Sequence, residues 1–133
     1  MKKFDKCSCG SGVAYAECCG ELLAGIRMAN TAIELMRSRY SAYVVKNVDY
    51  LVRTTHPTAR SVDLADSIRA WMRKVEWLKL HVISTEAGTE NDEIGKVEFM
   101  AEYLTDTAPG RHHECSVFEK VDGHWYYTGE EVE

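Results

Sequence analysis

Apolar and polar residues follow two different periods along this chain, and the change comes near residue 76. Before it, apolar side chains recur at steps of three and four, which is typical of helices with one buried face. Three helices are predicted: from a capping box at 31–34 to about Lys46, from Asp49 through Thr54 before Pro57, and from Ser61 or Asp63 to Val75. The apolar face of the first is made of Ile33, Met36, Tyr40, Tyr43, Val44 and Asn47.

After residue 76 the apolar residues alternate with polar ones, as they do in half-buried strands. Four strands are predicted, at 77–85, 94–104, 111–121 and 124–128, the last two joined by the hairpin dipeptide Asp122-Gly123. In the second strand Val97, Phe99, Ala101 and Tyr103 share one face, and Lys96, Glu98 and Glu102 share the other.

Three helices followed by a four-stranded antiparallel meander predict an α+β fold. The sheet needs a cover over its apolar face, and the amphipathic helices can supply it. A long curved sheet that wraps helices leaves a tapering hollow at its open end, where a ligand could bind.

Four of the five cysteines, Cys7, Cys9, Cys18 and Cys19, fall within 13 residues. Four thiolates this close can complete a tetrahedral shell around one Zn²⁺ ion, and a shell without a free position is structural. Gly10 and Gly12 suit the tight turn after the first pair, and we expect a short helical turn from Ser11 through Ala16, ended by Gly20. A disulfide framework, an iron–sulfur cluster and scattered inert thiols are the alternatives.

Composition narrows the class of protein. The 133 residues allow one domain, or a small module and a domain, and 45% apolar residues are enough for a core. The formal net charge is −5, and a four-thiolate zinc site would bring it to about −7, which argues against nucleic-acid binding by general charge. No apolar run is long enough to span a bilayer, and the basic amino terminus lacks the apolar stretch of a signal peptide. A cytoplasmic protein is expected, because reduced thiols can bind metal.

The cysteine segment resembles a known module. Cys7-Ser8-Cys9-Gly10-Ser11-Gly12, then five residues and Cys18-Cys19, is similar to the SEC-C zinc motif, best known from the tail of the SecA translocation ATPase. The resemblance implies that residues 1–22 form a zinc-binding module with these four cysteines as ligands. It also implies a protein partner for the module.

A second resemblance covers the rest of the chain. The segments that carry it are 35–40, Ala42-Tyr43, Tyr50-Leu51, His56-Pro57, Trp77, Gly95-x-Val97-x-Phe99-x-Ala101, Glu114-x-Ser116-x-Phe118 and Asp122-Gly123-x-Trp125-Tyr126-Tyr127. Together they resemble the YchJ-like domain. The resemblance implies a cone-shaped nuclear transport factor 2-like fold, also called cystatin-like, over residues 23–133, and it implies no particular activity.

Arg37, Arg39, Tyr40 and His56 are the candidate ligand-binding residues of the hollow. A guanidinium at its mouth favours a ligand with an anionic or carbonyl group. The alternative is architectural: both arginines bond backbone carbonyls or Glu114 and hold the helix in place.

The segment 112–115 offers a second candidate, because alternation places His112 with Glu114 on one face and His113 with Cys115 on the other. The first pair could bind metal or act as acid and base, and the second could form a nucleophile dyad. A lone cysteine such as Cys115 is more often a small buried apolar residue.

The function predicted from the sequence is therefore a binding or adaptor protein with a structural zinc site. Its zinc module is expected to dock a protein partner, and its cone to bind a small ligand or to form a homodimer through the sheet. No catalytic residue is assigned. The alternative is an enzyme that acts on a small molecule in the cone, with His56 or His113 as base and Arg37 as anion anchor.

Overall fold

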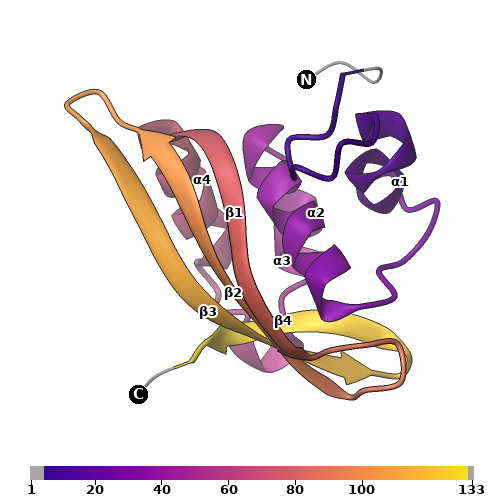
Figure 1. Ribbon diagram of the computed structural model, residues 1–133. Coiled ribbons are helices and arrows are strands. Elements are labelled where there is room, and N and C mark those ends of the chain that lie inside the picture. Colours follow the sequence, from indigo (N-terminus) through magenta and orange to yellow (C-terminus); the bar gives the residue numbers. More distant parts are fainter. Residues whose placement is uncertain (1–4, 132–133) are drawn as a thin grey trace.

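The computed structural model describes residues 5–131 and contains four α-helices, two 3₁₀ turns and four strands within them (Figure 1). The helices are α1 (Cys19–Leu23), α2 (Ala32–Val44), α3 (Val48–Arg53) and α4 (Leu64–Lys74), and the 3₁₀ turns are Tyr15–Glu17 and Pro57–Ala59. The strands are β1 (Glu76–Ala87), β2 (Ile94–Leu104), β3 (Pro109–Val121) and β4 (His124–Glu130). They form one antiparallel sheet in the order β1-β2-β3-β4.

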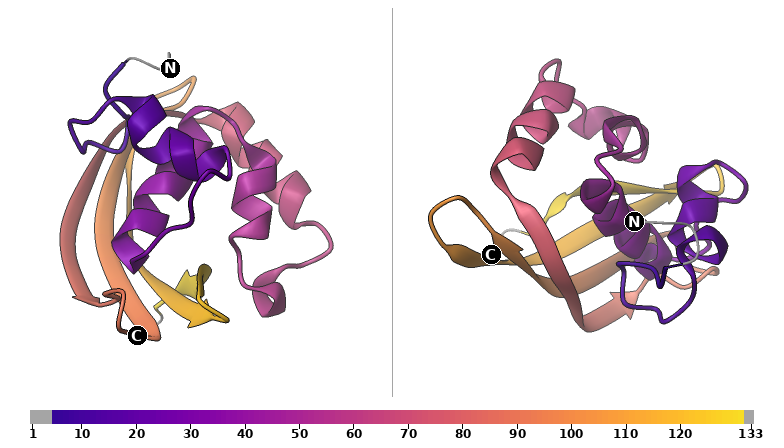
Figure 2. Two further views of the ribbon diagram at one scale, coloured as in Figure 1. Left: turned by 90° about the vertical axis from the view of Figure 1, so that its right-hand side faces the viewer. Right: turned by 90° about the horizontal axis from the view of Figure 1, so that it is seen from above.

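The sheet curves around the helices, which all lie on its concave side (Figure 2). Helix α2 contacts all four strands, and α3 packs between α2 and α4. The predicted α+β fold, with helices on a curved four-stranded antiparallel sheet, is confirmed.

The predicted alternation in β2 is confirmed as well. Val97 and Ala101 are almost completely buried and belong to the same core cluster as Phe118 of β3. The opposite face of the sheet is polar, with His81 paired to Glu102 and His113 paired to Glu98. Alternation alone therefore identified which face of the sheet the helices cover.

Helix α2 is buried on more sides than its sequence pattern predicts. Thr31 caps it as expected, because its hydroxyl accepts a hydrogen bond from the backbone amide of Glu34 at 3.2 Å. Outside the predicted apolar face, however, Leu35, Ser38, Ser41 and Ala42 are also buried. They are covered because the sheet packs on one side of α2, and α1 and α3 pack on the others.

Helix α3 begins two residues earlier than predicted. Asn47, not Asp49, caps it, with its side-chain oxygen accepting from the amide of Tyr50 at 3.0 Å. Asp49 lies inside the first turn instead, where its carboxylate still complements the helix dipole.

The segment between the cysteines and α2 departs most from the prediction. Gly20 is the second residue of α1 and does not end a helical turn. Helix α1 also runs across the predicted domain boundary between residues 22 and 23. Leu22 and Leu23 are buried, whereas Ile26 is 72% exposed. The Trp125 indole fixes the connector to β4 through a 3.1 Å hydrogen bond to the carbonyl of Asn30.

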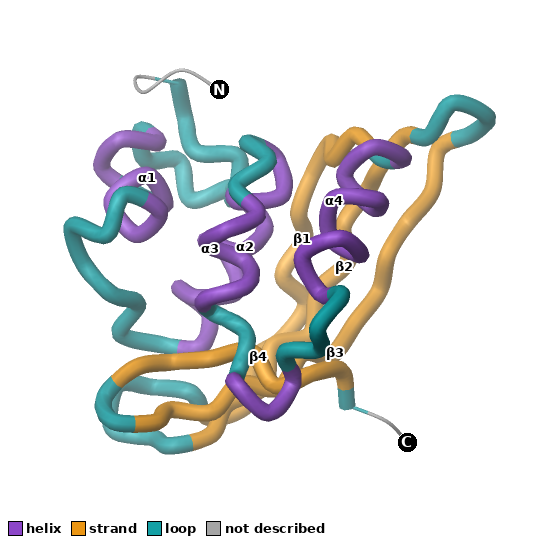
Figure 3. The backbone as a smooth tube through the Cα atoms, turned by 180° about the vertical axis from the view of Figure 1, so that it is seen from behind, coloured by secondary structure: helices purple, strands orange, loops and turns teal. Residues whose placement is uncertain are grey.

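The tube view from behind places α4 beside β1 at one end of the cone and α1 at the other side of α2 (Figure 3). Among residues 5–131, no helix is long and apolar enough to cross a membrane.

Candidate metal centre and cone pocket

The four cysteines of the amino-terminal segment converge on one point. Their Sγ atoms all lie within 4.8 Å of one another, and the Sγ atoms of Cys9 and Cys18 are 3.7 Å apart. A tetrahedral ion with bonds of about 2.3 Å to sulfur requires sulfurs about 3.8 Å apart. The four thiols are not joined by disulfides. This geometry fits a single metal ion with four sulfur ligands.

Two short backbone structures bring the cysteines together. In the first, the amide of Gly10 donates to the carbonyl of Cys7 at 3.1 Å, and Gly10 and Gly12 have φ of 87° and 83°. The predicted glycine turn is confirmed. Residues other than glycine rarely adopt this backbone conformation. In the second, the 3₁₀ turn 15–17 delivers Cys18, and Cys19 opens α1.

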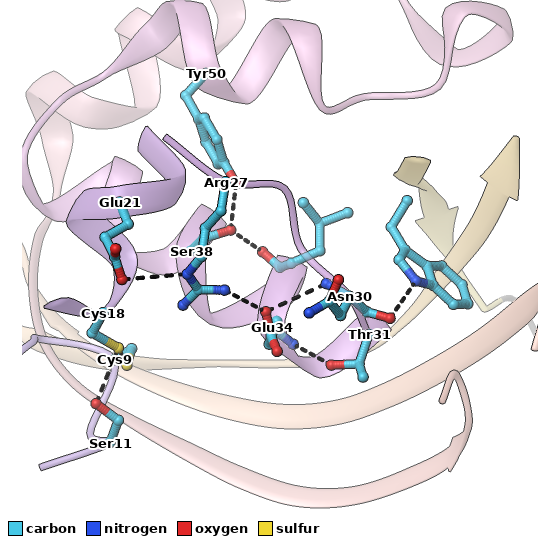
Figure 4. A network of polar contacts seen from close by, with 12 residues as sticks. Cys9, Ser11, Cys18, Glu21, Arg27, Asn30, Thr31, Glu34, Ser38 and Tyr50 are labelled. Carbon is cyan, nitrogen blue, oxygen red and sulfur yellow. Dashed lines mark hydrogen bonds and ion pairs between the residues drawn. The ribbon is translucent and has the colours of Figure 1, made fainter. Parts of the chain in front are cut away.

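Polar groups surround the sulfurs. The Ser11 hydroxyl lies 3.1 Å from Cys18 Sγ (Figure 4), and the buried Ser41 hydroxyl of α2 lies 3.4 Å from Cys7 Sγ. Arg37 of α2 donates to the carbonyl of Cys9. Such outer contacts orient ligands and offset thiolate charge.

The thiols also perturb one another. Hydrogen bonds from Cys19 and Cys7 lower the pKa of Cys9, while Cys7 and Cys9 raise the pKa of Cys19. Adjacent thiolates repel one another, and a divalent cation bound between them would offset that charge.

A separate cavity of about 110 Å³ lies inside the cone, between α2, α4 and the sheet. Aromatic rings make most of its wall, with Trp77 at the centre: its ring lies 6.0–6.2 Å from those of Tyr40, Tyr43 and Trp71. The remaining lining residues include Met36, Arg39, Phe99, His112, Glu114, Ser116 and Tyr127. We call this cavity the cone pocket.

The carboxylate of Glu114 is the hub of the polar groups in the cone pocket. It accepts hydrogen bonds from His112 at 3.0 Å, from Tyr127 at 2.8 Å and from the Ser116 hydroxyl. Burial alone would raise the pKa of Glu114, but these hydrogen bonds lower it below its usual value. The same contact with Glu114 raises the pKa of His112, against the effect of burial. The two side chains therefore favour a charged imidazolium–carboxylate pair.

Two donors in the wall are less well satisfied. Arg39 uses Nη1 for the carbonyl of Leu51 at 2.9 Å and the hydroxyl of Thr54 at 2.7 Å, and its guanidinium lies 4.6 Å from the centre of the Tyr127 ring. No carboxylate within residues 5–131 forms an ion pair with it. The indole nitrogen of Trp77 is buried and has no hydrogen-bond partner in that part of the chain.

The comparisons with known proteins agree with this architecture. Residues 31–129 match the family model described as YchJ, middle NTF2-like domain. The chain belongs to the YchJ-like family. Two relatives named UPF0225 protein support the assignment: one from Geobacter sulfurreducens is 42% identical over 92% of this chain and 76% of its own, and one from Photorhabdus laumondii is 45% identical over 91% and 77%.

Two solved structures resemble this YchJ-like chain along nearly its whole length. The solution structure of RPA3114, a SEC-C motif containing protein from Rhodopseudomonas palustris, is 41% identical, covers 97% of this chain and 99% of its own, and has a TM-score of 0.87. The crystal structure of a SEC-C motif containing protein from Psychrobacter arcticus is 27% identical, covers 98% and 84%, and has a TM-score of 0.79. Both recognised resemblances, the SEC-C motif and the YchJ-like domain, are confirmed.

The YchJ-like fold does not bring the four predicted ligand-binding residues together. Arg39 and Tyr40 line the cone pocket, but Arg37 points to the cysteines. Residues two apart on a helix lie on different sides of it, so Arg37 and Arg39 cannot share one pocket. Both arginines bond backbone carbonyls, which is the architectural alternative.

His56 lies outside the cone pocket as well. Its Nδ1 contacts the Thr58 hydroxyl at 2.8 Å, where it caps the 3₁₀ turn 57–59, and its Nε2 is 3.8 Å from Glu119. The proposed base His113 is on the outer face of the sheet, 2.7 Å from Glu98, and the half-buried Cys115 shares that face. Neither histidine can therefore act as a base in the cone pocket.

The sequence did not place His112 and Glu114 in the cone pocket. Alternation paired the two residues, and this pairing is confirmed by their 3.0 Å contact. The register of β3 against β2 supplies the missing step, because Ala101 faces His112 and Phe99 faces Glu114. Aligning the apolar face of the second predicted strand with the third across the turn could have identified the pair.

Proposed function

We propose that this chain is a small-ligand-binding protein whose cone is fastened to a structural zinc centre. The observation that carries the proposal is that one cavity has an aromatic wall and two hydrogen-bond donors: Arg39, which has no ion-pair partner, and Trp77 Nε1, which has no hydrogen-bond partner within residues 5–131. Such a wall holds a planar apolar body, and the donors suit a carboxylate or carbonyl oxygen.

The size of the cone pocket limits the ligand. Its volume of about 110 Å³ compares with about 150 Å³ for an engineered apolar cavity that accepts benzene. The cone pocket is smaller than that cavity, so it encloses at most part of a single ring or a short chain, and the rest of the ligand would lie at its mouth. Burial of the unpartnered Trp77 nitrogen costs about 1–3 kcal/mol, which a ligand oxygen bonded to it would recover.

For the metal, four sulfur donors around one point favour Zn²⁺ among common ions. The four residues Cys7, Cys9, Cys18 and Cys19 would hold it, with no position for water, so its role is to order a segment too small for a core of its own. Sulfurs within 4.8 Å of one another suit one ion better than an iron–sulfur cluster, whose several metal atoms spread their ligands apart.

Benzoate tests the cone pocket, with ¹H–¹⁵N NMR as the readout. We expect benzoate to shift the indole signal of Trp77, and we expect Trp77→Phe to weaken its affinity about tenfold, as the loss of one good hydrogen bond implies. Trp71→Phe is the matched control, because Trp71 lines the same cavity but its nitrogen is not a buried donor without a partner. Equal affinity in the wild type and both variants would count against the proposal.

A second candidate function is acid–base catalysis in the same cavity, and the His112–Glu114 pair favours it. A carboxylate that holds one imidazole nitrogen leaves the other free to exchange protons with a ligand. Deuterium exchange at the methyl group of pyruvate, followed by NMR, tests this candidate. Exchange that is faster with the wild type than with His112→Gln would support it, and equal rates would argue against it.

The protein partner at the cysteine module and the homodimer through the sheet stay predictions. A protein partner at the cysteine module is supported by the exposed apolar side chains of Val13 and Ile26, which are 43% and 72% exposed. Affinity capture should lose partners when Cys18 and Cys19 are replaced by serine. A homodimer through the sheet would have to bury its polar outer face, and sedimentation velocity decides whether it forms.

A further inference from the structure

A second cavity, of about 360 Å³, lies where the cysteine module meets the cone. Segments far apart in the sequence enclose it: α1, the connector 24–30, α3, the residue after the 57–59 turn, and the start of β4. It shares no lining residue with the cone pocket: Leu35 is its one lining residue from α2, whereas Met36, Arg39, Tyr40 and Tyr43 of that helix line the cone pocket. We call this cavity the junction groove.

Two guanidinium groups of the junction groove are held by backbone carbonyls. Arg53 donates through Nη2 to the carbonyl of Leu23 at 3.1 Å. Arg60 donates through Nε to the carbonyl of Thr55 at 2.7 Å and through Nη2 to that of Arg53 at 2.9 Å. A guanidinium has five N–H donors, so both side chains are fixed in place and retain donors for a further partner.

The charge of these two groups is poorly balanced. Arg53 has one acidic neighbour, Asp49, at 3.7 Å, whose side chain is 90% exposed, so their attraction is weak. Within residues 5–131 Arg60 forms no ion pair.

The third arginine of the junction groove differs from these two. Arg27 contacts Glu21 at 3.3 Å and Glu34 at 3.0 Å, and Figure 4 shows it between the two carboxylates. Its charge is already neutralised. The unbalanced positive charge therefore lies on the α3 side of the groove.

The floor of the junction groove is apolar and aromatic. Leu22, Leu35 and Trp125 are buried beneath it, and Met28 is 55% exposed at its edge. The half-buried ring of Tyr126 completes the wall beside β4. A ligand for this groove needs a flat apolar body as well as an anionic end.

We propose that the junction groove binds a small aromatic phosphate monoester. The phosphate group of a monoester has three terminal oxygens and carries up to two negative charges, so it can bridge Arg53 and Arg60. A carboxylate has one charge and matches one guanidinium. The volume of about 360 Å³ falls within the usual range of small-molecule sites, which is roughly 300–1,000 Å³. This site is independent of the cone pocket and of the ligand proposed there.

Phenyl phosphate is the probe, added to the metal-loaded full chain, with calorimetry and the Trp125 indole signal as readouts. The indole nitrogen of Trp125 donates to the carbonyl of Asn30 at the junction groove, so its signal reports on this groove. The indole signal of Trp77 reports on the cone pocket, so the two proposals can fail separately. We expect Arg60→Gln and Arg53→Gln each to weaken binding about tenfold or more, as the loss of a charge-assisted contact implies. Arg69→Gln, an exposed arginine of α4, should leave the affinity unchanged.

Two lysine variants and two further ligands make the result decisive. Arg53→Lys and Arg60→Lys keep the charge and should bind more tightly than the glutamine variants, which separates lost binding from lost folding. Inorganic phosphate and phenol each carry half of the proposed chemistry and should bind more weakly than phenyl phosphate. An unmoved Trp125 signal at millimolar phenyl phosphate would overturn the proposal, as would equal weakening by Arg69→Gln or equal binding of inorganic phosphate.

Discussion

The metal centre and the cone pocket are assembled in opposite ways. The centre takes its four sulfurs from 13 consecutive residues, folded by one glycine turn and one 3₁₀ turn. The cone pocket takes its wall from two helices and four strands, separated by up to 91 residues between Met36 and Tyr127. A local site depends on its ion for order, whereas a site built from distant segments depends on the core behind it.

Helix α2 joins the two sites. Arg37 and Ser41, one turn apart, face the cysteines, whereas Met36, Arg39 and Tyr40 face the cone pocket. One helix thus forms the wall of both. The comparison predicts that each site can be damaged while the other stays intact.

Removal of the metal ligands should have the largest effect. We expect Cys9→Ser to abolish stoichiometric zinc and to lower the free energy of unfolding by on the order of 4 kcal/mol, since loss of a structural metal is among the most destabilising changes. The amide signals of residues 5–23 should collapse toward random-coil positions, while those of β2 and β3 persist. Elemental analysis and ¹H–¹⁵N NMR measure both.

Cys115→Ser is the control for this variant, because Cys115 lies on β3, outside the metal centre. It should keep full zinc content. If Cys9→Ser retained zinc, or unfolded the sheet together with the module, the separation of the two regions would be wrong.

A substitution in the core of the cone should lower its stability and leave the metal centre intact. In Gly95→Ala the new Cβ would lie 2.4 Å from Gly88 Cα, at the point where the β1–β2 hairpin packs on Ala32 of α2. We expect a loss of about 1–3 kcal/mol, the usual cost of overpacking, with unchanged zinc content. Urea unfolding followed by tryptophan fluorescence measures the loss.

Gly110→Ala provides the comparison for that cost. Its Cβ would meet the ring of Tyr103, at 2.5 Å, and not backbone. A side chain can turn aside, so this variant should lose less stability than Gly95→Ala. The reverse order would show that the hairpin does not press on α2 as tightly as described.

The same contrast explains how far the sequence could lead. The cysteine spacing predicted that four sulfurs meet at one point because all four cysteines are neighbours in the chain. Alternation identified the inner face of β2 because the strand is regular. To predict the cone pocket, one must know the direction of each side chain around α2 and the register of β3 on β2. No single segment of the sequence contains this information. For that reason Arg37 was wrongly grouped with Arg39, and His112 was left unplaced.

The prediction that His56 lines the hollow was wrong for a different reason. A histidine just before a proline is pushed out of helical geometry and here caps the 3₁₀ turn, so its ring is used locally. Ile26 is apolar yet 72% exposed, whereas Ala29 of the same connector is buried. Apolar character alone does not decide burial in an irregular segment.

The link between the two sites gives a smaller effect. Arg37→Gln removes the bond from α2 to the Cys9 carbonyl, and we expect a weakening of zinc affinity by about tenfold, the lower end for outer-shell contacts. Competition with a chromophoric chelator measures it. Benzoate affinity should not change, because Arg37 does not line the cone pocket.

Arg39→Gln is the mirror-image control, since it should weaken benzoate binding and leave zinc affinity unchanged. A result in which either variant altered both affinities would mean that α2 transmits changes between the sites and does not merely separate them.

The smallest effect concerns pH. The pKa of His112 is raised in the folded chain, so its contact with Glu114 stabilises fully below the unfolded pKa of histidine and loses that effect as pH rises through the folded pKa. The pKa of Glu114 is lowered, so its contribution is present above the unfolded pKa of glutamate and is lost as pH falls through the folded pKa. Stability from the pair should therefore be greatest between the unfolded pKa values of the two groups, about 4.3 and 6.5.

His112→Gln tests this window. The wild type should exceed the variant in unfolding free energy by about 1 kcal/mol at pH 5.5, a value reduced for the partly exposed imidazole, and the difference should shrink toward pH 8. His113→Gln removes a histidine from the opposite face of the same strand and leaves the cone pocket untouched. If both variants followed the same pH profile, the profile would reflect histidines in general and not the buried pair, and the cone pocket would lack the polar hub that distinguishes it from the metal centre.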